Sequence, residues 1–90
     1  MELVFEKNGE KYEATFEASD NFNIHLEREE GGFVNVYQSG TQGGEYALAA
    51  NWSDYEGGKV FDCDFGALVY PKYIKVTSRS KVNKAVVTTN

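Results

Sequence analysis

Residues 21–27 of the chain read NFNIHLE, and they decide the fold class because apolar and polar side chains alternate in them without a break. Successive side chains of a β-strand point to opposite faces, so Phe22, Ile24 and Leu26 share one face and His25 lies on the other. This pattern predicts a strand that is buried on one side only.

The same period of two recurs along most of the chain, whereas no segment of ten or more residues has the 3.6-residue period of a helix. Glycine-rich turns divide the alternating stretches. About eight or nine short strands at this spacing predict an all-β, single-domain antiparallel β-sandwich, or a small barrel, over residues 1–90. The strands are expected near residues 2–7, 10–18, 21–29, 33–38, 45–50, 59–65, 67–70, 73–78 and 82–88.

Two turn signals define boundaries between these strands. Asn8 and Gly9 separate the first two strands and predict a hairpin with a type I′ turn, whose two central residues both need a positive φ. Pro71 has no backbone N–H, so it predicts an edge, a bulge or a break between strands.

The length and the first residues limit the class of protein. Ninety residues suffice for one small domain, and the aromatic content of 14% supplies the large rings that a small core needs. The opening MELVFEK lacks the basic and apolar regions of a signal peptide, which predicts a cytoplasmic protein or one that leaves the cell by another route; a shortened N-terminus would give the same pattern. No run is long enough to span a bilayer, so no membrane partner is expected.

A basic stretch stands out in a chain of net charge −5. Residues 70–84, YPKYIKVTSRSKVNK, hold five basic side chains and no acidic one. Residues 1–45 hold ten acidic and three basic residues, and residues 46–90 hold four acidic and six basic ones. Because acids outnumber bases overall and alternation divides the basic residues between two faces, no nucleic-acid partner is expected.

Two interpretations of the basic stretch follow. In the first, it serves its own fold, through Lys/Glu pairs across neighbouring strands and by protecting an exposed edge near the AVVTT run from pairing with another sheet. In the second, it is an interaction surface for an acidic partner or a second copy of the chain. The residues of that surface are Lys72, Lys75, Arg79, Lys81 and Lys84.

Few residues are available for catalysis or metal binding. His25 is the only histidine, is expected to face solvent, and has no nucleophile motif beside it. Cys63, the only cysteine, alternates with two phenylalanines and is expected to be a small buried hydrophobe whose thiolate the flanking aspartates oppose. Asp62 and Asp64 lack the spacing of a calcium loop and predict a solvated polar face. We therefore predict no enzyme, no catalytic residue, no metal site and no cofactor.

Residues 51–58, NWSDYEGG, have the clearest pattern for ligand binding. Trp52 and Tyr55 stand among polar turn residues, where an exposed ring beside a carboxylate such as Asp54 can stack on a sugar and hydrogen-bond its hydroxyls. Exposed rings are also frequent hot spots in protein contacts. The alternative interpretation is that Trp52 folds back over one end of the sandwich.

Two stretches, ATFEASDNFNIHLEREEGG and DFGALVYPKYIKVTSRSKVNKAVVT, resemble small all-β proteins of gut bacteria and of the tailed phages that infect them. The resemblance covers most of the chain, through FNIHLER and a late YPKYIKV, and includes no catalytic signature. It implies a structural or accessory role, such as decorating a capsid or fibre, and so a virion-associated location. It transfers no functional residues.

The sequence thus predicts a non-enzymatic structural or protein-interaction module that is an accessory or decorating component of a larger assembly. The expected partner is a protein or a second copy of the chain. The alternative function is carbohydrate binding through the loop that carries Trp52, Asp54 and Tyr55, with a glycan as the partner.

Overall fold

The computed structural model describes residues 1–18, 20–41, 43–52, 58–66 and 72–89, with the backbone alone for residues 48–52 and 72. These residues form strands and turns and no helix. A short strand, β1 (Glu6–Asn8), precedes seven strands of six to eight residues in the described part of the chain. The seven are β2 (Lys11–Ala18), β3 (Phe22–Arg28), β4 (Val34–Ser39), β5 (Ala47–Trp52), β6 (Val60–Phe65), β7 (Lys72–Ser78) and β8 (Val82–Thr89).

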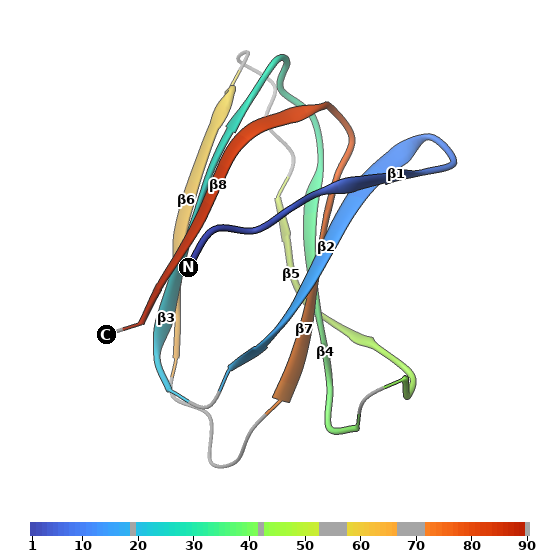
Figure 1. Cartoon of the computed structure of the whole chain (residues 1–90), viewed down its shortest axis with the longest axis vertical. Helices are drawn as coiled ribbons and strands as arrows, with labels where there is room; N and C mark the ends of the chain where they lie inside the picture. Colours follow the sequence, from blue (N-terminus) through green and yellow to red (C-terminus); the bar gives the residue numbers. More distant parts are fainter. Residues whose placement is uncertain (19, 42, 53–57, 67–71, 90) are drawn as a thin grey trace.

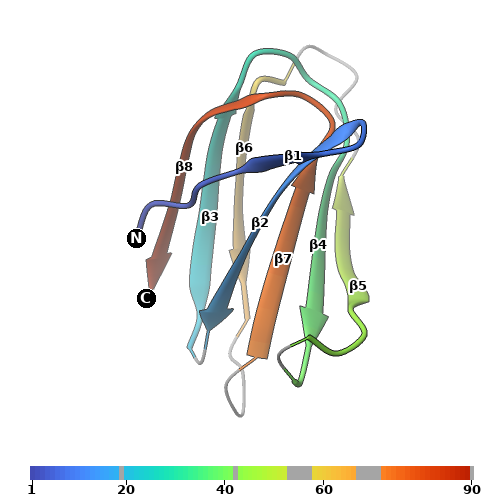
Figure 2. The same ribbon diagram turned by 45° about the vertical axis from the view of Figure 1, so that its right-hand side comes forward.

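The strands form two antiparallel sheets that face each other (Figure 1). The larger sheet has the order β1-β2-β7-β4-β5, and the smaller sheet has the order β6-β3-β8. Figure 2 shows β7 between β2 and β4 at the centre of the larger sheet. The all-β antiparallel sandwich predicted from the two-residue period is therefore confirmed.

The core lies between the sheets because each strand turns its apolar face inward. Phe22, Ile24 and Leu26 of β3 are at most 2% exposed, as the alternation predicted. The ring of Phe22 meets that of Phe16, from the larger sheet, edge to face at a centroid distance of 5.5 Å. The other buried core residues come from both sheets: Val34, Val36, Phe61, Ile74, Val76, Ala85 and Val87.

A buried arginine ties the loops together at one end of the sandwich. Arg28, the last residue of β3, is only 3% exposed. Its guanidinium donates hydrogen bonds to the carbonyl oxygens of Gly32, at 3.1 Å, and of Gly58, at 2.6 Å. It also reaches Oγ of Ser78 at 3.5 Å. Because these acceptors lie in three separate parts of the chain, one side chain fixes their relative positions.

The first hairpin differs from its prediction by one residue. Asn8 pairs with Lys11 in the ladder, so the turn consists of Gly9 and Glu10. Gly9 has a φ of +66°, and no described residue other than glycine has a positive φ. The predicted type I′ turn centred on Asn8 and Gly9 is therefore wrong; a glycine with positive φ at the first central position suits a type II′ turn.

The first predicted strand, near residues 2–7, is divided between the two sheets. Residues 6–8 pair with β2, whereas Glu2 forms a bridge with Val86 of β8. The N–H of Leu3 also donates to the carbonyl of Ala85, at 3.0 Å. The start of the chain thus covers one edge of the smaller sheet.

The strands that carry the basic stretch lie at different places in the two sheets. The stretch was expected to protect an exposed edge near the AVVTT run. β7, which carries Lys72 and Lys75, is paired on both sides by β2 and β4, whereas Lys84 lies on β8, the edge strand that contains this run. Residues 1–3 cover part of the edge of β8. The strand predicted at 67–70 and Pro71 lie outside the described residues.

Candidate functional site

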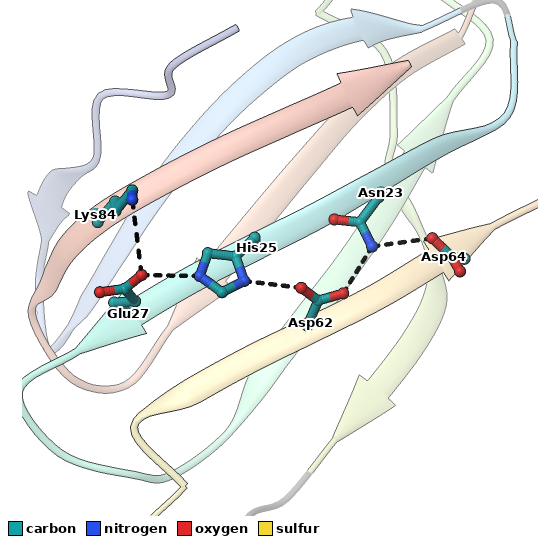
Figure 3. A network of polar contacts seen from close by, with 6 residues as sticks. All are labelled: Asn23, His25, Glu27, Asp62, Asp64 and Lys84. Carbon is teal, nitrogen blue, oxygen red and sulfur yellow. Dashed lines mark hydrogen bonds and ion pairs between the residues drawn. The ribbon is translucent and has the colours of Figure 1, made fainter. Parts of the chain in front are cut away.

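A continuous chain of polar contacts crosses the outer face of the smaller sheet (Figure 3). We call it the polar network. Because β3 is the central strand, its outward side chains have neighbours on both sides: His25 pairs in register with Asp62, and Glu27 with Lys84. The network consists of Asn23, His25 and Glu27 of β3, Asp62 and Asp64 of β6, and Lys84 of β8.

His25 is held between two carboxylates, and its ring side chain is 30% exposed. Nδ1 lies 2.8 Å from Oδ2 of Asp62, and Nε2 lies 2.9 Å from Oε2 of Glu27. A neutral imidazole has a single N–H and can donate to only one of them, whereas the imidazolium donates to both. The hydrogen bond with Glu27, followed by that with Asp62, accordingly raises the pKa of His25 above its ordinary value of 6.5.

The carboxylates respond in the opposite direction. The hydrogen bond from His25 lowers the pKa of Glu27, and Lys84, whose Nζ lies 3.9 Å from Oε2 of Glu27, adds to this. The pKa of Asp62 is lowered first by the Asn23 amide and then by His25. The charged forms of His25, Glu27 and Asp62 are therefore all favoured at mildly acidic pH.

The amide of Asn23 bridges the two aspartates of β6. Its Nδ2 donates to Oδ1 of Asp62 at 2.7 Å and to Oδ1 of Asp64 at 2.9 Å. Both aspartates are exposed, as the predicted polar face requires. Within the described residues, no group of three or more His, Cys, Asp or Glu side chains is arranged to hold a metal ion.

The network is better suited to linking strands than to transferring protons. A histidine that acts as a general base must direct one ring nitrogen at the group that loses the proton. In His25 both ring nitrogens are directed at carboxylates. The contact of His25 with Asp62 on β6 and that of Glu27 with Lys84 on β8 instead connect the central strand of the smaller sheet to its two neighbours.

Cys63 is half-buried and packs against the core, so it is less buried than the sequence predicted. Burial raises the pKa of its thiol, and the neighbouring Asp64 and Asp62 raise it further. The prediction that the flanking aspartates oppose a thiolate is therefore confirmed. A thiol with a raised pKa is a poor nucleophile at neutral pH.

The outer face of the larger sheet carries aromatic rings around a lysine. Nζ of Lys75, on β7, lies 4.9 Å from the ring centroid of Tyr37 and 4.9 Å from that of Tyr46. Such distances allow cation–π attraction with both rings. Tyr73 lies two residues before Lys75 and so on the same side of β7. We call these four half-buried residues the tyrosine face.

A pocket of about 170 Å³ opens farther along the same side of β7. Thr77, which pairs in register with Asn35 of β4, is only 6% exposed, and its Oγ1 has no hydrogen-bond partner. A buried hydroxyl left without a partner costs about 1–3 kcal/mol. The lining of this Thr77 pocket consists of Glu10, Lys11, Phe33, Asn35, Thr77 and Arg79.

Exposed side chains surround the buried Thr77 in this pocket, and Phe33 and Arg79 are two of them. Phe33 is 44% exposed, and Arg79 is exposed as well. The backbone N–H of Arg79 donates to the carbonyl of Phe33 at 3.1 Å. The aliphatic part of Arg79 lies over Gly32, where an added Cβ would stand 3.3 Å from it at a φ of +120°. Glycine at this position therefore gives the arginine room.

The five basic residues predicted as an interaction surface do not come together. Lys75 and Arg79 lie on the outer side of the larger sheet, and Lys81 is exposed in the turn before β8. Lys84 belongs to the polar network on the other sheet. Only the backbone of Lys72, at the start of β7, is described.

The predicted carbohydrate-binding residues are only partly described. The backbone of Trp52, the last residue of β5, pairs with Val34. Asp54 and Tyr55 lie outside the described residues. Their role in ligand binding stays a prediction.

Sequence reasoning missed Tyr37, Tyr46 and the Thr77 pocket. One signal was present, because Tyr37 follows Val34 and Val36 in FVNVYQS and must point away from them in a regular strand. The second signal, the neighbourhood of Tyr37 and Lys75, depends on the pairing of β4 with β7. That pairing is not visible in the sequence.

Comparisons with family models, with curated proteins and with solved structures find no match for the chain. The resemblance to small all-β proteins of gut bacteria and their phages therefore stays a prediction.

Proposed function

We propose that the chain is a non-enzymatic recognition module that binds a protein partner, as an accessory component of a larger assembly. The proposal assigns the partner to the outer side of the larger sheet. The observation that carries it is the placement of Lys75 between Tyr37 and Tyr46, with Tyr73 beside them.

Tyrosine and arginine are enriched where protein interfaces gain most of their affinity. A tyrosine ring offers a large contact area and loses little conformational freedom on binding. Here the rings are already ordered around a lysine on a strand at the centre of the sheet. The exposed Phe33 and Arg79 extend this surface toward one end of β7.

Two features support the non-enzymatic part of the proposal. Both ring nitrogens of His25, the only histidine, contact carboxylates. Cys63, the only cysteine, has a raised pKa. The only histidine and the only cysteine are thus in environments that disfavour acid–base and nucleophilic catalysis, respectively.

Matched variants of the two sheets test the proposal. The immobilised chain is used to capture a partner from a cell lysate, the partner is identified by mass spectrometry, and its affinity is measured by calorimetry. Light scattering over a range of concentrations detects a second copy of the chain as the partner. We expect Tyr73→Ser with Lys75→Ser to weaken binding about tenfold or more, as loss of hot-spot residues does.

The control carries Asn23→Ser with Asp64→Ser on the polar network, and it should bind as the unmodified chain does. Equal losses in the two double variants would contradict the proposal. So would a chain that stays monomeric and captures no protein.

Carbohydrate binding is the second candidate, and one observation favours it. The backbone of Trp52 pairs with Val34, which is adjacent in sequence to the exposed Phe33. Trp52 is the only tryptophan, so tryptophan fluorescence reports on the surroundings of this residue alone. A saturable change of emission with one member of a glycan panel, and loss of binding by calorimetry in Trp52→Ala, are expected. An unchanged emission at millimolar sugar concentrations would exclude this candidate.

A further inference from the structure

We infer that the Thr77 pocket receives an acidic side chain, aspartate or glutamate, of the protein partner. The inference rests on the proposed function and adds the chemistry of the partner. It is carried by the hydrogen-bond donors of the pocket, by the unpartnered hydroxyl of Thr77 and by the size of the cavity.

The lining is rich in donors and positive overall. Arg79 and Lys11 bring two positive charges against the single carboxylate of Glu10, and Asn35 can donate through its amide. Neither Arg79 nor Lys11 forms an ion pair within the described part of the chain. A carboxylate only accepts hydrogen bonds, so it matches these donors, and the planar guanidinium binds it with two parallel bonds.

Thr77 points to the same ligand independently of the charges. Its Oγ1 is buried and has no partner, although a hydroxyl can donate one hydrogen bond. A carboxylate oxygen seated among the lining residues can accept that bond. Binding would thereby satisfy a group that the unbound fold leaves unsatisfied.

The volume of about 170 Å³ favours one side chain of a larger partner. Sites for free small molecules usually enclose about 300–1,000 Å³. Phe33, on the exposed side of the pocket, is available for the apolar neighbours of the acidic residue. Thr77 and Lys75 lie on the same side of β7, two residues apart, so a protein seated on the tyrosine face can extend into the pocket.

The test is an NMR titration of the ¹⁵N-labelled chain with a blocked pentapeptide that carries one glutamate between two leucines. We expect saturable shifts at the backbone amides of Phe33, Asn35, Thr77 and Arg79 at millimolar peptide. The peptide with glutamine in place of glutamate should bind about tenfold more weakly, because it loses the charge-assisted bonds.

Three variants locate the binding. Arg79→Gln should weaken binding of the glutamate peptide about tenfold. Thr77→Val keeps the shape of the side chain and removes the hydroxyl, and it should weaken this binding about threefold or more. Lys81→Gln, a nearby exposed cation outside the pocket, should bind as the unmodified chain does. Thermal melting of each variant confirms that it is folded.

Equal binding of the glutamate and glutamine peptides would overturn the inference, as would unchanged binding in both pocket variants. Shifts confined to Tyr37, Tyr73 and Lys75 would overturn it while leaving the proposed function intact. A third outcome is that glucuronate shifts the pocket amides and the peptide does not. The ligand of the pocket would then be an acidic sugar, which would also overturn the inference.

Discussion

The two outer faces of the sandwich use their charged side chains in opposite ways. On the smaller sheet, each member of the polar network contacts another member, from Lys84 through His25 to Asp64. On the larger sheet, Lys75 contacts aromatic rings and Arg79 lines a pocket, and neither has an ion pair in the described part of the chain. The two faces therefore differ in whether their charged side chains are paired with opposite charges.

The largest loss of stability is expected in the apolar layer between the two faces. Leu26 is fully buried on β3, between the outward residues His25 and Glu27. We expect Leu26→Ala to lower the free energy of unfolding by about 3 kcal/mol, through lost burial and the cavity left behind. Urea denaturation measures this loss. A loss below about 1 kcal/mol would contradict the central place of Leu26 in the core.

The second-largest loss of stability is expected at the end of the sandwich where Arg28 contacts the loops. Arg28→Met removes the donors that hold the partly buried carbonyls of Gly32 and Gly58. We expect a loss of about 2–3 kcal/mol, since hydrogen bonds to charged groups are the stronger ones. The control is Lys81→Ala, an exposed cation that should change stability by about 0.5 kcal/mol or less. Similar losses in the two variants would contradict the assigned role of Arg28.

The polar network should make the stability of the chain depend on pH. The raised pKa of His25 means that its contribution is complete below 6.5 and is lost as the pH rises through the folded-state value. The lowered pKa values of Glu27 and Asp62 mean that theirs are present above 4.5 and 3.8 and are lost in acid. The network should therefore stabilise the fold most between pH 4.5 and 6.5.

Urea midpoints of the unmodified chain and of His25→Gln at several pH values measure this effect. The gap between the two proteins should be widest near pH 5.5 and narrower at both pH 3 and pH 9. A gap that stays constant with pH would show that His25 does not bridge the carboxylates as an imidazolium.

Among the residues with assigned contacts, the smallest loss of stability is expected on the tyrosine face. Lys75→Gln removes a cation from two rings near the surface and should cost about 0.5–1 kcal/mol. Lys75→Gln should weaken partner binding more than it weakens the fold. A loss of stability above about 2 kcal/mol, well beyond surface cation–π attraction, would assign this face to the fold and weaken the comparison.

The sequence predicted which side of each strand is buried more reliably than it predicted neighbours. Burial follows directly from alternation, so Phe22, Ile24 and Leu26 were correctly placed in the core. The turn after β1 was placed wrongly because Asn8, a good turn residue, is paired with Lys11 and donates from Nδ2 to Glu13 at 3.0 Å.

The candidate sites depended on strand order, which alternation does not determine. The contact of His25 with Asp62 joins residues 37 positions apart in the sequence, and the one between Asn23 and Asp64 joins residues 41 apart. Lys75 was recognised as a candidate from charge alone, whereas its aromatic neighbours required the pairing of β7 with β4. The carbohydrate-binding prediction at Trp52, Asp54 and Tyr55 is still to be tested.

The position of β7 also constrains how the chain reaches its fold. β2 and β4 are each paired with β7, and β3 is paired with β6 and β8. Among the described strands, consecutive ones are paired only in β1–β2 and β4–β5. Neither sheet has its complete set of neighbours until the last third of the chain is available. Most of the strand pairs therefore join sequence-distant segments, and folds dominated by such contacts typically form slowly.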